Sequence, residues 1–333
     1  MACRLSVAPM MDWTDRHCRF FHRQLSRRVR LYTEMVTAPA LVRGGALHLL
    51  EHSPEERPVA LQLGGSDPEE LAQAARLGAE AGYDEINLNV GCPSDRVQSG
   101  TFGAVLMRDP ARVADCVAAM RAAVAVPVTV KCRIGVDEQD PERVLPDFLA
   151  RMAEAGAAQV TVHARKAWLQ GLSPKENRDV PPLDYDLVRR MRDAFPALAI
   201  ALNGGVQTLD EVEAHLDDGF AGVMVGRAAY HRPWDILGEA DRRLWGAARA
   251  RTREDAARAM LPYIEAHLSA GGRLNQVTRH MLGLFAGRPG ARRWRQMLSE
   301  GAARPGAGPE LVEQALEAVA PEAWEARPAV RSA

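Results

Sequence analysis

The chain has little of several residue types that mark particular classes of protein. Its 333 residues include only five cysteines, an odd number with no CxxC pair, which argues against a disulfide framework or a structural zinc site. No apolar run reaches the roughly 20 residues that a membrane-spanning helix needs. The first residues lack the charged and then apolar pattern of a secretory leader. We therefore expect a cytoplasmic protein that binds no metal and no membrane.

Net charge excludes little, because 42 basic and 43 acidic residues leave a formal charge of −1. The basic residues are almost all arginine, and they are unevenly distributed. Seven arginines and a single acid, Glu300, lie between Arg273 and Arg304. Such a patch is a candidate contact for a polyanion. A second group of arginines recurs at helical spacing with few acids nearby: Arg16, Arg19, Arg23 and Arg27.

Eight short apolar runs alternate with amphipathic stretches up to residue 226, as in a chain of βα units. Eight such units in this length match a TIM (β/α)8 barrel. The alternative, a doubly wound sheet, usually opens with a GxGxxG turn, where this chain has Pro9-Met10-Met11-Asp12. The predicted strands are residues 5–8, 30–33, 59–63, 85–90, 128–133, 159–163, 199–203 and 222–225, and the predicted helices include 69–81, 111–123, 141–155, 185–194 and 209–216.

Beyond Tyr230 the strand pattern stops and only helical patterns remain. The glycine- and proline-rich breaks between them predict helices at 235–250, 253–269, 276–286, 291–300 and 309–319. We therefore predict an α/β protein whose barrel, residues 1–235, is followed by an all-helical domain, residues 236–326. The last residues, 327–333, are predicted to be a disordered tail.

One face of the predicted strands carries polar side chains. These residues alternate with aliphatic ones, so the aliphatic face would meet the helices and the polar face would look into the barrel. TIM barrels place their active sites at the C-terminal ends of the strands. Any one of these polar residues could be a hydrogen-bonded core residue, but five at equivalent positions favour a site: Gln62, Asn89, Lys131, His163 and Asn203.

The loops after strands seven and eight form the usual phosphate site of a TIM barrel. Here they contain Gly204, Gly205 and Gly226, followed by Arg227. Glycine lets main-chain N–H groups approach a phosphate, although tight turns alone would also explain these residues. A phosphate there, with Lys131 across the barrel to donate to the N1–C2=O edge of a flavin, suits FMN. The alternative for Lys131 is a buried ion pair.

Cys92 lies at a sharp turn directly after the fourth predicted strand, between Gly91 and Pro93. A free thiol with the ordinary pKa of about 8.5 is protonated at neutral pH and can act as a general acid. A nucleophile is the alternative, and it would need a base such as His163. A small buried residue in a turn is the third possibility. Cys116 and Cys132 are predicted to lie in the core.

Motifs along nearly the whole chain resemble the tRNA-dihydrouridine synthase family, and within it the DusA-type subfamily. The matching segments are residues 8–15 (APMMDWTD), 61–65 (LQLGG), 87–94 (NLNVGCPS), 130–135 (VKCRIG), 162–165 (VHAR), 203–205 (NGG), 225–227 (VGR), 278–281 (TRHM) and 289–295 (PGARRWR).

The resemblance implies an FMN enzyme that uses NADPH to reduce the C5–C6 double bond of uridines 20 and 20a in the tRNA D-loop. Flavin N5 would deliver hydride to C6, and Cys92 would protonate C5. Asn89 would contact the flipped uracil, and tRNA would be bound by Lys175, Arg178, Arg292 and Arg295. The residues implied to hold FMN are Pro9, Met10, Met11, Gln62, Lys131, His163, Asn203, Gly204, Gly205, Gly226 and Arg227.

The resemblance also gives the arginine-rich stretches a possible use. The helical domain would clamp the RNA, whereas the helix spanning Arg16 to Arg27 would either contact RNA or be a solvated outer helix. Trp294 would stack on a base or lie in the core. The main rival function is a flavin-dependent barrel reductase of a small pyrimidine-like molecule, and the second is a non-catalytic RNA-binding barrel. We expect a monomer.

Overall fold

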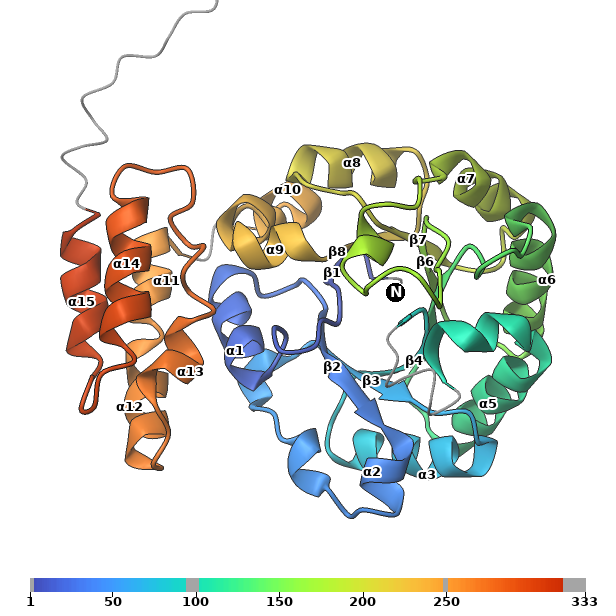
Figure 1. The fold of residues 1–333 in the computed structure, drawn as a ribbon, viewed down its shortest axis with the longest axis horizontal. Coiled ribbons are helices and arrows are strands. Elements are labelled where there is room, and N and C mark those ends of the chain that lie inside the picture. The colour runs from blue at the N-terminus through green and yellow to red at the C-terminus, as the bar shows by residue number, and fades with distance from the viewer. Residues whose placement is uncertain (1–2, 94–101, 248–250, 320–333) are drawn as a thin grey trace, which may run out of the picture. The chain divides into compact units, whose positions relative to one another are not determined.

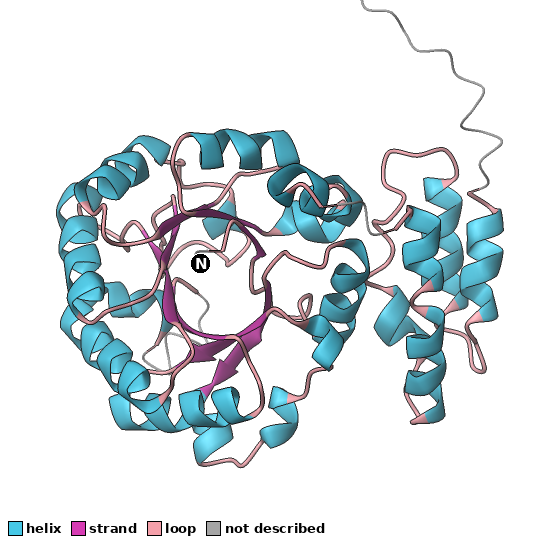
Figure 2. Cartoon of the chain, turned by 180° about the vertical axis from the view of Figure 1, so that it is seen from behind, coloured by secondary structure: helices cyan, strands magenta, loops and turns pink. Residues whose placement is uncertain are grey.

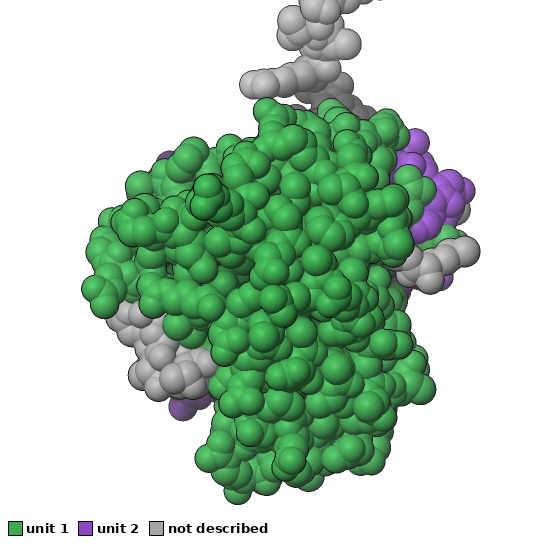
Figure 3. All heavy atoms as spheres, turned by 90° about the vertical axis from the view of Figure 1, so that its right-hand side faces the viewer, with its two compact units in different colours: residues 1–16, 28–226 green, residues 17–27, 227–333 purple. Residues whose placement is uncertain are grey.

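The computed structural model describes residues 3–93, 102–247 and 251–319, so the predicted tail at 327–333 lies outside the described residues. The chain divides into two compact units, shown in different colours in Figure 3. Unit 1 comprises residues 1–16 and 28–226, and unit 2 comprises residues 17–27 and 227–333. Unit 2 therefore combines an early segment with the C-terminal part. The predicted domain boundary at residue 235 remains a prediction.

Unit 1 contains the predicted barrel. Its described strands form one eight-stranded parallel sheet in the order β1-β8-β7-β6-β5-β4-β3-β2, surrounded by helices (Figures 1 and 2). A parallel bridge between Ser6 and Arg30 joins the two edges of the sheet. The TIM-barrel prediction is thus confirmed. The strands are β1 (Leu5–Val7), β2 (Leu31–Thr37), β3 (Val59–Gly64), β4 (Glu85–Val90), β5 (Val128–Arg133), β6 (Val160–His163), β7 (Ile200–Asn203) and β8 (Gly222–Val225).

The outer helices of unit 1 begin at side-chain caps. Asp67, Asp109 and Asp184 each accept a hydrogen bond from the main-chain N–H three residues further on. Such a cap stabilises a helix by about 1 kcal/mol. The helices are α2 (Ala38–Val42), α3 (Pro68–Glu80), α5 (Pro110–Ala123), α6 (Pro141–Glu154), α7 (Tyr185–Ala194) and α8 (Leu209–Asp217). The five longer ones match the predicted ranges to within one residue at either end.

Strand β2 is longer than the predicted range 30–33, because it continues to Thr37. Its pairing with β3 shifts register between Tyr32 and Met35. Such an irregularity breaks the two-residue alternation of inward and outward side chains. The strand pattern that sequence analysis depends on is therefore lost halfway along β2.

Unit 2 is helical, as predicted, but its helices are shorter than expected. The predicted helix 253–269 is interrupted after Arg258, because Pro262 has no N–H to donate to the carbonyl four residues earlier. The predicted helix 276–286 is replaced by α13 and successive turns, and 235–250 by a π-helix (Trp234–Gly238) and α10. The helices are α1 (Arg16–Leu25), α9 (Arg227–His231), α10 (Ala240–Trp245), α11 (Arg253–Arg258), α12 (Leu261–Ser269), α13 (Leu274–Thr278), α14 (Ala291–Gly301) and α15 (Glu310–Glu317).

The predicted arginine stripe of α1 is solvated only in part, because Arg16 is half-buried and Arg27, just past the end of the helix, is exposed. Arg19 and Arg23 are both buried, and the Arg23 guanidinium donates to the Ser26 carbonyl at 2.8 Å. A long arginine stem packs against apolar surface while its head finds an acceptor. Trp294 lies in the core, one of its two predicted positions: it is fully buried and its indole N–H donates to the Met281 carbonyl at 3.0 Å.

A buried carboxylate anchors the barrel interior near the start of β4. Glu85 accepts hydrogen bonds from the Tyr32 hydroxyl at 2.5 Å and the Thr129 hydroxyl at 2.6 Å. Its second oxygen accepts from the Arg30 guanidinium at 2.8 Å. Burial first, and Glu85 second, raise the pKa of Tyr32 well above its ordinary value, so the hydroxyl remains a donor. Glu85 therefore links β2, β4 and β5 from inside.

We predict that Arg30→Met lowers the free energy of unfolding by about 2–4 kcal/mol, because it leaves the buried Glu85 carboxylate without its cation. Urea denaturation measures this quantity. Arg151→Met is the matched control: Arg151 pairs with Asp147 on the exposed face of α6, and its loss should cost less than about 1 kcal/mol. Equal losses in the two variants would contradict the anchoring role of Glu85.

Candidate active site

The register of the sheet brings the predicted inward-facing residues to the C-terminal end of the barrel. Asn89 on β4 is paired with Lys131 on β5, and His163 on β6 is paired with Asn203 on β7. The pairing of Arg133 with His163 connects the two sets. Sequence alternation alone predicted this shared face.

Gln62 and Asn89 are fixed by hydrogen bonds to each other and to a third amide. The Asn89 amide nitrogen donates to Gln62 Oε1 at 2.8 Å, and the Gln62 amide nitrogen donates to Asn87 Oδ1 at 2.8 Å. Asn87 in turn donates to the Thr129 hydroxyl at 2.8 Å. Each amide nitrogen carries two hydrogens, so Gln62 and Asn89 each retain one for a ligand. Asn87 and Thr129 were not predicted as parts of the site.

The turn that carries Cys92 is held through its main chain. Asn89 Oδ1 accepts hydrogen bonds from the N–H groups of Gly91 and Cys92, both at 3.0 Å. The Cys92 carbonyl accepts from the N–H of Ala104 at 2.9 Å. The Cys92 side chain is half-buried. A fixed backbone with a partly accessible thiol suits a group that must meet a substrate in one position.

The other two candidate cysteines are core residues, as predicted. Cys116 and Cys132 are both completely buried. Burial raises the pKa of each thiol to about 12. A thiol of this kind forms almost no thiolate at neutral pH and is chemically inert.

Positively charged side chains lie near the C-terminal ends of β5 and β6. Burial, and then Arg133, lower the pKa of Lys131 to about 8, so the amine is still mostly protonated at pH 7. Burial, and then Arg133 and Lys131, lower the pKa of His163 well below its ordinary value. His163 is therefore a neutral imidazole at pH 7, with one ring nitrogen that can donate a hydrogen bond and one that can accept.

The glycine-bearing loops after β7 and β8 allow a ligand to approach the main chain closely. Gly204 and Gly205 have positive φ angles of 108° and 77°, which favour glycine. A Cβ atom on Gly204 would lie 2.6 Å from Cδ2 of His163, so no larger residue fits there. Asn203 donates to the Met224 carbonyl at 2.7 Å and joins the two loop-bearing strands.

The predicted residues after β1 lie beside the second of these loops. A Cβ atom on Gly226 would be 3.8 Å from Sδ of Met10, in ordinary contact. Pro9 is half-buried and Met10 is buried, whereas Met11 is 54% exposed. Arg227 follows Gly226 directly and begins α9. The structure thus brings Pro9 and Met10 to the Gly226 loop and leaves most of Met11 open to solvent.

The segment 164–184, between β6 and α7, carries Lys175 and Arg178. Its ends meet through a hydrogen bond from the Asp184 N–H to the Ala164 carbonyl at 2.8 Å. A parallel bridge between Val136 and Ala167 attaches it to the loop after β5. Lys175 is exposed, and Arg178 is half-buried and close enough to Lys131 to lower the pKa of that amine. The charge of Arg178 therefore acts on the barrel site.

Arg133 is part of the site although sequence analysis did not select it. It is only 3% exposed. Its Nε donates to the Gly91 carbonyl at 3.2 Å, and its Nη1 donates to the carbonyls of Lys166 at 3.1 Å and Asn177 at 2.8 Å. Its position two residues after Lys131, on the same strand face, was the one available signal.

In unit 2, Arg292 and Arg295 are exposed on α14, while Trp294 between them is buried. Residues three apart share a helix face, so the two guanidinium groups form one exposed basic strip. These arginines belong to unit 2, whereas the predicted residues on strands β3 to β7 belong to unit 1.

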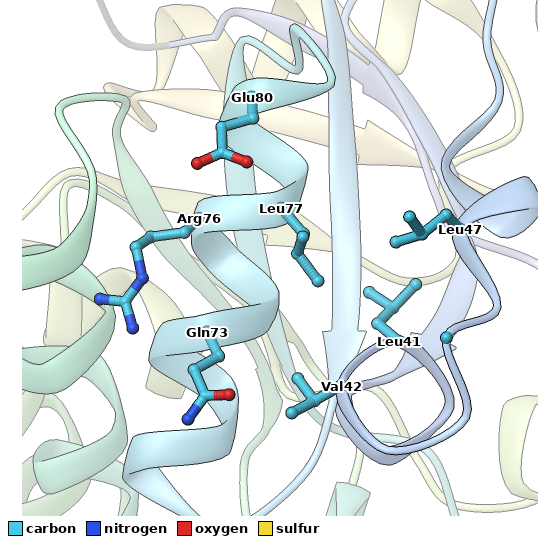
Figure 4. A pocket seen from close by; sticks show the side chains of 8 residues that line it. Leu41, Val42, Leu47, Gln73, Arg76, Leu77 and Glu80 are labelled. Atoms are coloured by element: carbon cyan, nitrogen blue, oxygen red, sulfur yellow. The ribbon is translucent and has the colours of Figure 1, made fainter.

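A pocket of about 380 Å³ lies elsewhere on unit 1, between side chains of α3 and the region of α2 (Figure 4). It contains none of the predicted site residues. In the described part of the chain, no cluster of three or more His, Cys, Asp or Glu side chains could hold a metal. Among the same described residues, no helix has the length and apolar character required to span a bilayer.

We predict a distinct titration of Lys131 in the ligand-free protein. The chain has only three lysines, so selective ¹³Cε-lysine labelling should give three resolvable NMR signals. One of them should titrate with a pKa of about 8, protonated below that pH and neutral above it, because burial disfavours the charged amine. Loss of this signal in Lys131→Arg would assign it. A spectrum in which no signal moves between pH 7 and 9 would refute the prediction.

Comparison with known proteins gives a consistent family. The family model described as Dihydrouridine synthase (Dus) matches residues 6–320. The chain is 57% identical over 317 residues to the tRNA-dihydrouridine(20/20a) synthase of Vibrio cholerae serotype O1, covering 95% of this chain and 96% of that protein. It is 59% identical over 314 residues to the protein of the same name from Xanthomonas campestris pv. campestris, covering 94% and 93%.

Among solved structures, morphinone reductase is similar with a TM-score of 0.51 and 15% identity, covering 74% of this chain and 86% of that chain. At this identity the likeness supports the barrel fold alone. The family match covers nearly the whole chain and includes the strands that carry Gln62, Asn89 and Lys131. This chain therefore belongs to the dihydrouridine synthase family.

Proposed function

We propose that this protein is a tRNA-dihydrouridine synthase that reduces the C5–C6 double bond of uridines 20 and 20a in the D-loop, with FMN as cofactor and NADPH as reductant. The two relatives named tRNA-dihydrouridine(20/20a) synthase support the reaction and the two positions. The observation that carries the proposal is the constellation at one barrel end. A half-buried thiol, Cys92, stands on a turn held by Asn89, next to the strand that bears Lys131.

The residues present fit FMN. A phosphate needs closely approaching N–H groups, and the positive φ angles of Gly204 and Gly205 create such a loop. The reduced flavin carries negative charge at its N1–C2=O edge, which a protonated lysine stabilises. The strongest influences on the pKa of His163 besides burial are four cations: Arg133, Lys131, Arg165 and Arg178. Such an excess of positive charge suits an anionic cofactor.

In this proposal Lys131 and the remaining hydrogen of the Gln62 amide hold the flavin, with Met10, His163, Asn203 and the glycine loops around it. Pro9, Met11 and Arg227 complete the predicted set. When bound, FMN would supply the hydride. Because NADPH and NADH share this chemistry, the choice of NADPH follows from the family resemblance alone.

The protein's own part in the reaction is to place the uracil and to deliver a proton. The remaining amide hydrogen of Asn89 is available to a uracil carbonyl oxygen. The thiol of Cys92 donates its proton to C5, a role that a protonated thiol can fill without a partner base. The thiolate that remains would be stabilised by the positive charges of Lys131 and Arg133. Cys92 is close enough to both groups to raise their pKa values.

A uridine in a folded tRNA must leave its stack to reach the barrel, which costs a few kcal/mol. Contacts from Lys175 and Arg178 in unit 1, and from Arg292 and Arg295 in unit 2, would offset this cost through the RNA backbone. A cytoplasmic location and a monomeric state remain predictions.

The direct test is to map dihydrouridine by position in tRNA from cells that lack this protein. Loss confined to positions 20 and 20a is expected, with recovery on incubation with purified protein, FMN and NADPH. If free uracil or another small pyrimidine is reduced while tRNA is not, the protein is instead a small-molecule reductase.

We predict that Cys92→Ala reduces dihydrouridine formation by about 100-fold or more, because the general acid is lost. Flavin absorbance and tRNA affinity should stay within about twofold, since neither depends on the thiol. The control Cys116→Ala removes a thiol from the core, outside the site, and should keep most of the activity. Near-normal turnover of Cys92→Ala would rule out the acid role.

We predict that the double variant Arg292→Ala, Arg295→Ala weakens tRNA binding and lowers the slope of log K against log salt by about 2, one for each lost phosphate contact. Binding is measured by fluorescence anisotropy at several salt concentrations. Removal of two exposed arginines from α6, Arg143→Ala with Arg151→Ala, is the charge-matched control and should leave the slope unchanged. Equal slopes in both double variants would show that α14 does not contact RNA.

A further inference from the structure

We infer that Arg133 is a positioning residue that couples the segment 164–184 to the turn bearing Cys92, so that RNA contact with this segment sets the position of the acid. The inference rests on the proposed function, since it concerns the same site. Arg133 is not in the predicted site, and it touches both structures through one guanidinium group.

On one side, Arg133 completes the restraint of the Cys92 turn. Asn89 holds the N–H groups of Gly91 and Cys92, and the Ala104 N–H holds the Cys92 carbonyl. The carbonyl of Gly91 belongs to the same peptide group as the Cys92 N–H, and it accepts from Arg133 Nε at 3.2 Å. Both ends of this peptide group are therefore held, and only the Arg133 end depends on another segment of the chain.

On the other side, Arg133 binds a rigid part of the segment 164–184. Its Nη1 donates to the Asn177 carbonyl at 2.8 Å and to the Lys166 carbonyl at 3.1 Å. Asn177 is fully buried, and its side chain accepts from the Trp168 N–H at 2.7 Å and donates to the Trp168 carbonyl at 2.8 Å. A displacement at the next residue, Arg178, is thus transmitted to the carbonyl that Arg133 holds.

Keeping the Arg133 guanidinium charged in its buried position costs free energy. Burial first, with the positive charges of Arg178 and Arg165 added, lowers the pKa of Arg133 to about 10, while Cys92 acts in the opposite direction. In the described structure its hydrogen bonds go to main-chain carbonyls, with no carboxylate among them. A buried charge held in this way adds little stability. Its function therefore lies in the geometry that it imposes.

Repulsion between Arg133 and Arg178 provides the link to RNA. Arg178 disfavours the charged form of Arg133, so the two guanidinium groups raise each other's energy. A phosphodiester bound at Arg178 would neutralise that charge and allow Arg133 to bind the Gly91 carbonyl more strongly. The Cys92 turn would then be tightest when RNA is present, which is when the proton is needed.

Arg133→Lys tests the coupling because it keeps the charge but removes the fork that reaches two opposite carbonyls. Oxidation of the reduced flavin by tRNA in a single turnover should slow by about 10-fold to 100-fold, because the acid is misplaced. Flavin reduction by NADPH and the Kd for tRNA should change by less than about twofold, since neither needs the Cys92 turn. Arg143→Lys, on the exposed face of α6, is the control and should change none of these.

A second readout needs no turnover. The rate at which iodoacetamide alkylates Cys92, followed by mass spectrometry of its peptide, reports the freedom of the turn. Arg133→Lys should raise this rate. Arg178→Ala should lower it about threefold in the wild-type background, by removing the repulsion, and leave it unchanged beside Arg133→Lys.

If Arg133→Lys and Arg178→Ala have additive effects on the alkylation rate, Arg133 has only a structural role. The same conclusion follows if Arg133→Lys slows flavin reduction and flavin oxidation equally and also lowers thermal stability. If Arg133→Lys does not fold, Asn177→Ala loosens the same segment and should also slow the tRNA step selectively; normal kinetics in that variant would overturn the inference. A wild-type protein that forms no dihydrouridine would contradict the proposed function instead, and the alkylation experiment would still decide the coupling.

Discussion

The site depends on one buried carboxylate. Glu85 can only accept hydrogen bonds when ionised, so the Thr129 hydroxyl must donate to it. The Thr129 oxygen is then left to accept from Asn87, which fixes the orientation of that amide. In the same way, the Gln62 amide nitrogen donates to Asn87, and the Asn89 amide nitrogen donates to Gln62. The Asn89 oxygen is therefore turned toward the N–H groups of the Cys92 turn. Every donor in this series of hydrogen bonds points toward Glu85, so the orientation of the Asn89 amide that holds the Cys92 turn is set from the opposite end of the barrel interior.

The two ends of the barrel interior differ in charge. Near the start of β4 the carboxylate of Glu85 has Arg30 as its partner, and the local charge is balanced. At the opposite end, the charge of Arg133 lowers the pKa of Lys131. In the described structure neither residue has a carboxylate among its hydrogen-bond partners. An anionic ligand is the natural complement of such a site. The barrel thus stores uncompensated positive charge where its ligands are proposed to bind.

Sequence analysis could predict those features that repeat with the period of a strand or helix. The alternation in β5 placed Lys131 on the inner face, and the glycines after β7 indicated a close-approach loop. The role of Arg133 could not be predicted, because its partners are main-chain carbonyls in a segment with no periodic pattern. The buried arginines of α1 show the opposite error, since a helical spacing of charges does not reveal which face is covered. Pro262 is the residue in the predicted helix 253–269 that signals its interruption.

Unit 2 contains helix α1, which comes from the beginning of the chain. Phe20 on α1 stacks on Tyr263 of α12 with ring centroids 4.0 Å apart, and Ser26 donates to Asp241 at 2.5 Å. In the sequence α1 precedes strands β2 to β8, whereas the helices that it packs against follow β8. The whole barrel must therefore be translated before α1 finds its permanent neighbours, and a fragment beginning at residue 227 would expose the surface that α1 covers. The helical unit can therefore form only after residues on both sides of the barrel sequence have been made.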